Sequence, residues 1–250
     1  LFVIFIQSHA IALMATLIPA TAPTAYLENK QLPVMPGLLT DLERKKSYIP
    51  AYDENGKVWT MQCIQDDGVK RFAKNSRKDG CFHAIGGMKE LAKAPVIVIA
   101  EGYATAGSLS QALDFSIVAA FDSGNLPSVA NALHAKFPDK PIVIAGDNDI
   151  HLEKTQGVNP GRKKAEEAAK AVGGKAMFPI FAPAEQMENP KSFTDFNDLA
   201  TKSVLGMDGV ERQVRAVVSA VIEKHRRGVQ LANEMERAQR QEREPRARRR

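Results

Sequence analysis

Two short apolar runs, each followed by acidic residues, constrain this chain more than any other feature. Residues 95–102 read Pro-Val-Ile-Val-Ile-Ala-Glu-Gly, and residues 141–149 read Pro-Ile-Val-Ile-Ala-Gly-Asp-Asn-Asp. Short runs rich in β-branched residues are typical of strands buried on both faces of a sheet. Because helical patterns separate the two runs, we expect both strands in one parallel sheet, with Glu101, Asp147 and Asp149 close together at its edge.

The sequence around these runs has the pattern of an α/β domain. Strands are expected at 95–100, 116–121, 141–146 and 175–180, and helices at 104–113, 128–137, 161–172 and, after the sheet, 209–226. Strands that alternate with helices predict a parallel, doubly wound sheet flanked by helices. The 250 residues, 44% of them hydrophobic, suffice to bury such a core.

A different pattern precedes this domain, since residues 38–87 form short alternating runs separated by turns. Asn55-Gly56 lies between two such runs, and Asp67-Gly68 marks a second turn. Asn-Gly between alternating runs is a strong hairpin signal. We therefore expect a small, antiparallel, β-rich subdomain ahead of the α/β domain.

These patterns divide the chain into five parts. They are an apolar segment of unassigned role at 1–24, the β-rich subdomain at 25–90, the α/β domain at 91–205, a C-terminal helix at 206–228 and a charged basic tail at 229–250. The first 20 residues lack the basic start of a signal peptide, and Pro19 ends the run short of a membrane span, so neither export nor a membrane anchor is expected. In the tail we expect a frayed helix or disorder.

Charge and cysteine content narrow the functional classes. The net charge of +5 comes from residues 224–250, which hold ten Lys or Arg against four Glu. This tail could hold DNA nonspecifically. The two cysteines, Cys63 and Cys81, cannot form a four-cysteine zinc site, and free thiols in a reducing cytoplasm are the expected state.

The three carboxylates predict a divalent cation. Asp147 and Asp149 are two residues apart, so in an extended segment their side chains share a face. Carboxylates that would otherwise repel one another are neutralised by Mg²⁺. Glu101 alone could be a dipole partner of the following helix, but that interpretation leaves the two aspartates unexplained.

A basic segment in the β-rich part is a candidate nucleic-acid surface. It holds five cations in nine residues: Lys70, Arg71, Lys74, Arg77 and Lys78. They surround Phe72, whose ring could stack on a base while the cations follow a phosphate backbone. The alternative is a solvated edge strand protected by its charges, and the sequence favours neither.

Three further acidic residues are additional candidates for the same site. Asp195 and Asp198 lie on an acidic loop that could fold over the site, although such a loop before a helix is equally a capping device. Asp122 follows the strand expected at 116–121 and could reach the same cleft, although Asp-Ser-Gly-Asn is also ordinary turn chemistry.

These residues resemble a known family. Glu101-Gly102 with Asp147-x-Asp149 matches the pattern of the TOPRIM (topoisomerase–primase) domain, and the string from Glu101 to Ala106, Glu-Gly-Tyr-Ala-Thr-Ala, resembles the signature of the conjugative-plasmid (TraC-type) DNA primases. The segments 120–126, 145–149, 159–162 and 195–199 are also similar to that group, so the resemblance covers about residues 25–220.

The resemblance implies a primase that makes RNA primers on single-stranded DNA from ribonucleoside triphosphates. It implies Glu101 as general acid or base and Asp147 and Asp149 as ligands of Mg²⁺, or Mn²⁺ in its place. The chain contains neither the zinc-binding cysteine and histidine set of such primases nor a P-loop, so a zinc-binding domain or a helicase would be a separate partner. A TOPRIM nuclease and a non-catalytic DNA-binding or docking module of a larger mobilisation protein remain alternatives.

Overall fold

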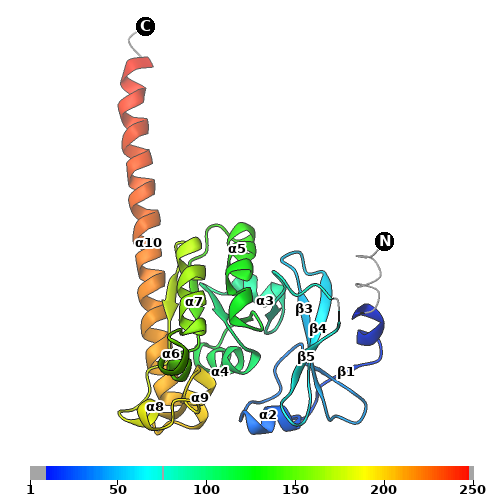
Figure 1. Cartoon of the computed structure of the whole chain (residues 1–250). Helices are drawn as coiled ribbons and strands as arrows, with labels where there is room; N and C mark the ends of the chain where they lie inside the picture. The colour runs from blue at the N-terminus through cyan, green and yellow to red at the C-terminus, as the bar shows by residue number, and fades with distance from the viewer. Residues whose placement is uncertain (1–9, 75, 248–250) are drawn as a thin grey trace.

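The structure, a computed structural model, contains two five-stranded sheets that lie side by side (Figure 1). It describes residues 10–74 and 76–247, without the side chains of 241–247. Part of the apolar segment expected at 1–24 and the last three arginines of the basic tail therefore fall outside the described residues.

The first sheet is antiparallel and has the order β1-β2-β3-β4-β5. Its strands are β1 (Ile18–Pro19), β2 (Leu39–Thr40), β3 (Ser47–Tyr52), β4 (Val58–Ile64) and β5 (Lys70–Phe72), and helix α2 (Ala25–Asn29) lies between the first two along the chain. Asp53 builds the β3–β4 hairpin, because its Oδ1 accepts the backbone N–H groups of Asn55 and Lys57, both at 3.0 Å. The β-rich subdomain and both predicted turns are confirmed.

The second sheet has the order β10-β9-β7-β8-β6. Its strands are β6 (His83–Ala84), β7 (Ile97–Ala100), β8 (Val118–Ala119), β9 (Ile142–Ala145) and β10 (Lys175–Met177). All pairs are parallel except β6 with β8, and β7 pairs directly with β9, so that Ala100 lies opposite Ala145. The predicted parallel sheet is confirmed, with one antiparallel edge strand that comes from within 25–90.

Helices cover both faces of this sheet. Those of the α/β part are α3 (Met88–Lys93), α4 (Tyr103–Leu113), α5 (Leu126–Lys136), α6 (Ile150–Gln156), α7 (Pro160–Ala171), α8 (Glu185–Glu188), α9 (Phe196–Thr201) and α10 (Gly206–Ala247), with a 3₁₀ turn, η1, at Ser123–Asn125. One face packs on α4, α9 and α10, and the other on α3, α5 and α7. Alternate residues of each strand fill the two cores, as period-2 side chains require.

All four strands expected in the α/β part are shorter than the sequence predicts, and β8 and β10 are shortened most at their C-terminal ends. β8 ends at Ala119 and the backbone then turns through Phe121, whose φ of 77° lies in the left-handed region. β10 ends at Met177, shortly before Pro179, which has no N–H to continue the sheet.

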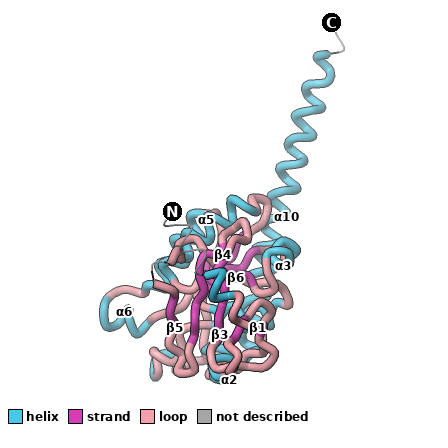
Figure 2. Tube along the Cα trace, turned by 90° about the vertical axis from the view of Figure 1, so that its right-hand side faces the viewer, coloured by secondary structure: helices cyan, strands magenta, loops and turns pink. Residues whose placement is uncertain are grey.

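The C-terminal helix is longer than predicted, since α10 continues through residues 229–247, where a frayed helix or disordered tail was expected. Val210, Val214 and Val218 anchor its first half in the core. Its second half leaves the body of the molecule, which Figure 2 shows clearly. Among the described residues, no helix is both long and apolar enough to span a membrane.

Candidate functional site

The carboxylates of Glu101 and Asp147 meet at the C-terminal edge of the parallel sheet. Glu101 follows β7 directly and Asp147 lies two residues beyond β9, its immediate neighbour in the sheet. Glu101 Oε2 and Asp147 Oδ1 are both buried and have no hydrogen-bond partner. Buried polar atoms without partners are rare in folded proteins, so these two oxygens are open to a ligand.

The proximity of these groups changes their acidity. Burial, together with the charges of Asp149, Asp122 and Asp195, raises the pKa of Glu101 to about 7, and the backbone of Ser123 opposes this rise. Burial and the charges of Glu101, Asp195 and Asp149 likewise raise the pKa of Asp147 well above its usual range. The protein thus gathers several acidic groups at this edge, where burial and mutual repulsion disfavour their ionisation.

This arrangement fits a divalent cation held by few protein ligands. Within the described part of the chain, no three Asp, Glu, His or Cys side chains converge closely enough to chelate an ion by themselves. Mg²⁺ commonly binds proteins through one or two carboxylates and completes its shell with water and substrate phosphates. The unpartnered oxygens of Glu101 and Asp147 are suitable donors for such an ion.

Asp149 is turned toward helix α7. It precedes α6, and its Oδ2 accepts the backbone N–H of Gly161 at 3.3 Å. The loop that carries Asp147 lies so close to the start of α7 that a Cβ on Gly161 would be 2.7 Å from the carbonyl oxygen of Asp147. A Cβ on Gly146, just before Asp147, would lie 2.5 Å from Cβ of Ala165. Glycines at both places allow the Asp147–Asp149 segment to sit against α7.

The three additional acidic candidates differ in how far they are engaged elsewhere. Asp195 caps α9 through Asp198 N–H at 2.7 Å, and burial and the charge of Asp198 raise its pKa. Asp198 is buried, and its two oxygens contact Lys202 Nζ at 2.6 Å and the N–H and Oγ1 of Thr194 at 3.1 Å. Asp122 accepts the backbone N–H of Asn125 and forms an ion pair with Lys78.

The five cations of the basic segment separate into different environments. Lys70 is surface-exposed, and desolvation and the charge of Lys30 lower its pKa, while the charges of Asp195, Asp147 and Glu101 oppose this shift, so Lys70 is within reach of the acidic cluster. Lys30 was not predicted, since its approach to Lys70 depends on packing between segments 40 positions apart, of which the sequence gives no signal.

The remaining cations are exposed or already engaged. Arg77 stacks on the Trp59 ring at 4.5 Å, and Lys78 pairs with Asp122, while Arg71 and Lys74 are exposed. The ring of Phe72 packs at 5.2 Å between centroids against Phe121, with the ring planes at 87°, and is half-buried. β5 is an edge strand, as the alternative interpretation expected.

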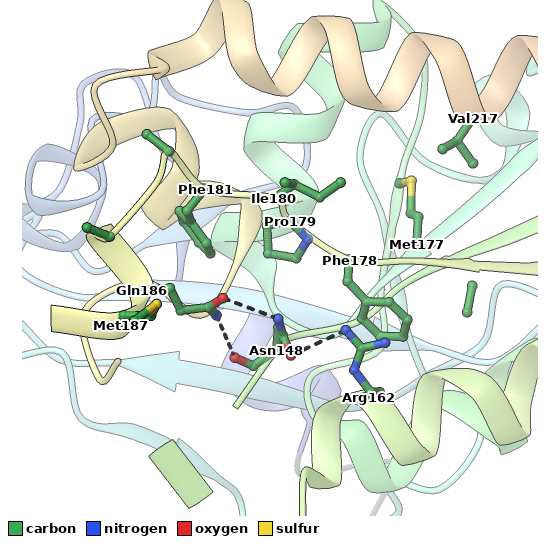
Figure 3. Close-up of a pocket in the computed structure, with 13 residues that line it drawn as sticks. Asn148, Arg162, Met177, Phe178, Pro179, Ile180, Phe181, Gln186, Met187 and Val217 are labelled. Atoms are coloured by element: carbon green, nitrogen blue, oxygen red, sulfur yellow. Dashed lines mark hydrogen bonds between the residues drawn. The ribbon is translucent and has the colours of Figure 1, made fainter. Parts of the chain in front are cut away.

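A pocket of about 480 Å³ opens beside Asn148, the residue between the two aspartates. Figure 3 shows Asn148 between the side chains of Gln186 and Arg162, with Phe178 and Phe181 further along the wall. The guanidinium of Arg162 lies 4.1 Å from the centroid of the Phe178 ring. In an extended segment the side chain of Asn148 would point away from both aspartates. In the structure Asn148 is buried, and its side chain contacts residues on both sides of the loop.

Comparisons with known proteins agree with this geometry. Residues 96–204 match the family model described as the Toprim domain. The chain is 50% identical over 289 residues to a DNA primase TraC of Escherichia coli, an alignment that covers 93% of this chain and 27% of that protein. A second DNA primase TraC of Escherichia coli is 49% identical in an alignment 262 residues long, gaps included, that covers 83% of this chain and 18% of the relative. The chain thus spans about a quarter or less of these relatives.

Solved structures show a weaker likeness. The RNA polymerase domain of Mycobacterium tuberculosis primase DnaG has a TM-score of 0.47 and 16% identity, over 76% of this chain and 61% of that one. The primase fragment of the bacteriophage T7 primase-helicase protein has a TM-score of 0.45 and 16% identity, over 77% and 69%. Likeness at this level does not bear on function. The family match and the two relatives show that this chain carries a Toprim domain of the TraC primase type.

Proposed function

We propose that this chain is the catalytic part of a DNA primase that joins ribonucleotides on a single-stranded DNA template in the presence of Mg²⁺ or Mn²⁺. The observation that carries this proposal is the meeting of Glu101 with Asp147 at the ends of neighbouring parallel strands, where each has a buried, unpartnered carboxylate oxygen. The high identity to two proteins named DNA primase supports synthesis over cleavage.

Glu101 is the proposed proton-transfer group. A general base works best when its pKa is near the working pH, and burial brings the pKa of Glu101 to about 7. A primer 3′-hydroxyl must lose its proton as it attacks an α-phosphate, so a neutral-range carboxylate beside the reacting oxygen suits the step. The backbone of Ser123 lowers the pKa of Glu101 and so favours its charged form.

Asp147 and Asp149 would hold the cation, which when bound offsets the negative charge of the triphosphate. Asp195 borders the same charge cluster and is a further candidate ligand, whereas both oxygens of Asp198 are used inside the protein. Lys70, with Lys30 beside it, is placed to attract phosphate oxygens toward the carboxylates.

The exposed cations of the basic segment, Arg71 and Lys74, are proposed to contact the template backbone. Lys78 and Arg77 would contribute less, because their side chains are engaged by Asp122 and Trp59. A zinc-binding domain or a helicase outside this chain is the proposed partner for choosing start sites and for movement along DNA. The unpaired thiols of Cys63 and Cys81 suit a cytoplasmic location.

The test is an incubation of the purified chain with single-stranded DNA, labelled ribonucleoside triphosphates and Mg²⁺ or Mn²⁺, beside Glu101→Gln. Primer synthesis and template cleavage are followed on one gel. We expect short labelled RNA that disappears in the variant. Glu101-dependent cleavage would instead establish a Toprim nuclease, and single-stranded DNA binding without either product would establish a binding module.

A further inference from the structure

We infer that Asn159 and Gln186 are positioning residues that hold the Asp147–Asp149 segment in the shape required to bind its cation. This inference rests on the proposed metal-dependent function. The segment needs external support because it lies outside every helix and strand, between β9 and α6. Its carboxylates also repel one another and Glu101, so the free segment would relax away from the arrangement that binds metal.

Asn159 supports the segment from the α7 side. Its Oδ1 accepts the backbone N–H of Asp149 at 3.0 Å and that of Arg162 at 3.2 Å, so one oxygen both caps α7 and fixes Asp149. Its Nδ2 donates to Asn148 Oδ1 at 3.0 Å. Asn159 is only 8% exposed, so water does not compete for these bonds.

Gln186 supports the segment from the opposite direction. Its Nε2 donates to the carbonyl oxygen of Asn148 at 3.1 Å and to that of Phe193 at 2.9 Å. Its Oε1 faces Asn148 Nδ2 at 3.4 Å. The neighbouring acidic loop adds one backbone bond, from Asn148 N–H to the carbonyl oxygen of Thr194 at 2.8 Å.

Asn148 therefore forms hydrogen bonds through its N–H, its carbonyl oxygen and its side chain, and Figure 3 shows those with Gln186. The supporting side chains are both amides, each with a donor and an acceptor but no charge. An amide can thus fix the backbone between two carboxylates without adding to their repulsion or competing for the cation. Polar residues behind metal ligands commonly change metal affinity about 10–100-fold when they are removed.

Gln186→Met is the informative variant, because methionine keeps the length of the side chain and loses its hydrogen bonds. The chain offers a matched control in Gln213, whose side chain bonds the N–H and carbonyl of Ile180 at 3.0 and 2.7 Å. Gln213→Met removes a similar pair of side-chain hydrogen bonds to the backbone, but from a loop that holds no proposed metal ligand. Asn159→Ser is a second variant that retains a hydroxyl able to cap α7 and loses the bond to Asn148.

The experiment measures Mn²⁺ binding to the full chain from the loss of the free-ion EPR signal, together with thermal unfolding. We expect Gln186→Met and Asn159→Ser to raise the Mn²⁺ Kd about 10-fold or more, while Gln213→Met binds like wild type at a similar melting temperature. In primer synthesis, the Mg²⁺ concentration for half-maximal rate should rise, and the rate at saturating Mg²⁺ should change little.

Asp147→Asn separates failure of this inference from failure of the proposed site. If Asp147→Asn abolishes Mn²⁺ binding and Gln186→Met leaves the Kd unchanged, the positioning role is wrong and the metal site stands. If Asp147→Asn binds Mn²⁺ like wild type, or wild type binds none, the proposed site is wrong and this inference falls with it. Equal losses in Gln186→Met and Gln213→Met would show a general effect of destabilisation and would also overturn the inference.

Discussion

Lys78, at the end of the basic segment, forms an ion pair with Asp122, which follows strand β8 of the parallel sheet. Beside it, Phe72 packs against Phe121 with the ring planes at 87°, and Lys78 Nζ lies 5.9 Å from the centroid of Phe72. These contacts join the antiparallel sheet to the turn whose Ser123 N–H bonds Glu101. The two sheets therefore meet next to the proposed catalytic carboxylate.

The Lys78–Asp122 pair should contribute little to stability. Both side chains are more than a third exposed, at 38% and 39%, and exposed pairs are worth about 1 kcal/mol or less because water screens them. A double-mutant cycle of Lys78→Met and Asp122→Asn, measured by urea unfolding, should give a coupling energy below about 1 kcal/mol. A larger value would mean that the contact locks the two sheets together.

The same pair predicts a difference in DNA affinity. Lys74→Met should weaken single-stranded DNA binding more than Lys78→Met, because Lys74 is exposed and Lys78 is already paired. If Lys74 contacts a phosphate, its loss should also reduce the slope of log affinity against log salt by about one. Fluorescence anisotropy over a salt series measures both, and equal effects of the two variants would contradict the assignment.

Glu101→Gln should stabilise the protein in a pH-dependent way. The folded-state pKa of Glu101 is about 7, above its ordinary value of 4.5, so the folded protein binds the extra proton and loses stability as pH rises from 4.5 to 7. At pH 8 the variant should be more stable than wild type by up to about 3 kcal/mol, and near pH 4.5 the two should be similar. Urea unfolding at both pH values is the measurement, and a gain that does not depend on pH would show that ionisation of Glu101 is not its cause.

Asp53→Ala should destabilise the β3–β4 hairpin. Burial raises the pKa of Asp53, but hydrogen bonds from Trp59, Lys57 and Asn55 lower it overall, and the bond from Trp59 Nε1 is 2.8 Å long. Loss of the hydrogen bonds to this buried carboxylate should lower the free energy of unfolding by about 1–3 kcal/mol near pH 7. The difference between variant and wild type should shrink at a pH below the folded-state pKa of Asp53, because wild type is then protonated and loses the same stabilisation.

Trp59 is the one tryptophan of the chain, so its fluorescence follows this unfolding directly. Glu54→Ala is the matched control, because the Glu54 side chain bonds only the side chain of Asn55 among the residues that the structure describes. Similar losses of stability in the two variants would show that the turn, and not the buried Asp53–Trp59 contact, sets the effect.

The sequence allowed the two sheets to be predicted because their signals are local. The β-branched runs at β7 and β9 and the Asn55-Gly56 turn depend on neighbouring residues only, and both were confirmed. The shortening of β8 was not predictable, because Phe121 adopts a left-handed φ that such a residue rarely adopts.

The site could be predicted only in outline. The acidic residues at the strand ends follow from topology, so Glu101 and Asp147 could be placed near one another from the sequence. The contacts of Gln186 and Asn159 with the Asp147–Asp149 segment, and of Lys30 with Lys70, arise from packing between segments far apart in the sequence. The types of these residues do not indicate such contacts. Asn159 caps α7 and Pro160 is its first residue, both of them preferred types at these positions, but neither residue type indicates the contact with Asp149.

Helix α10 should be stabilised by packing in its first half only. Val214 is fully buried against the core, whereas Val229 is 48% exposed on the half that leaves the body. Val214→Ala should therefore cost about 2 kcal/mol, because it removes two buried methyl groups, and should lower the melting temperature by about 4–8 °C. Val229→Ala should change stability by about 0.5 kcal/mol or less, since alanine also favours the helix. Differential scanning calorimetry of both variants is the test. A large loss in Val229→Ala would mean that the second half of α10 is packed in solution, against the body or against another molecule.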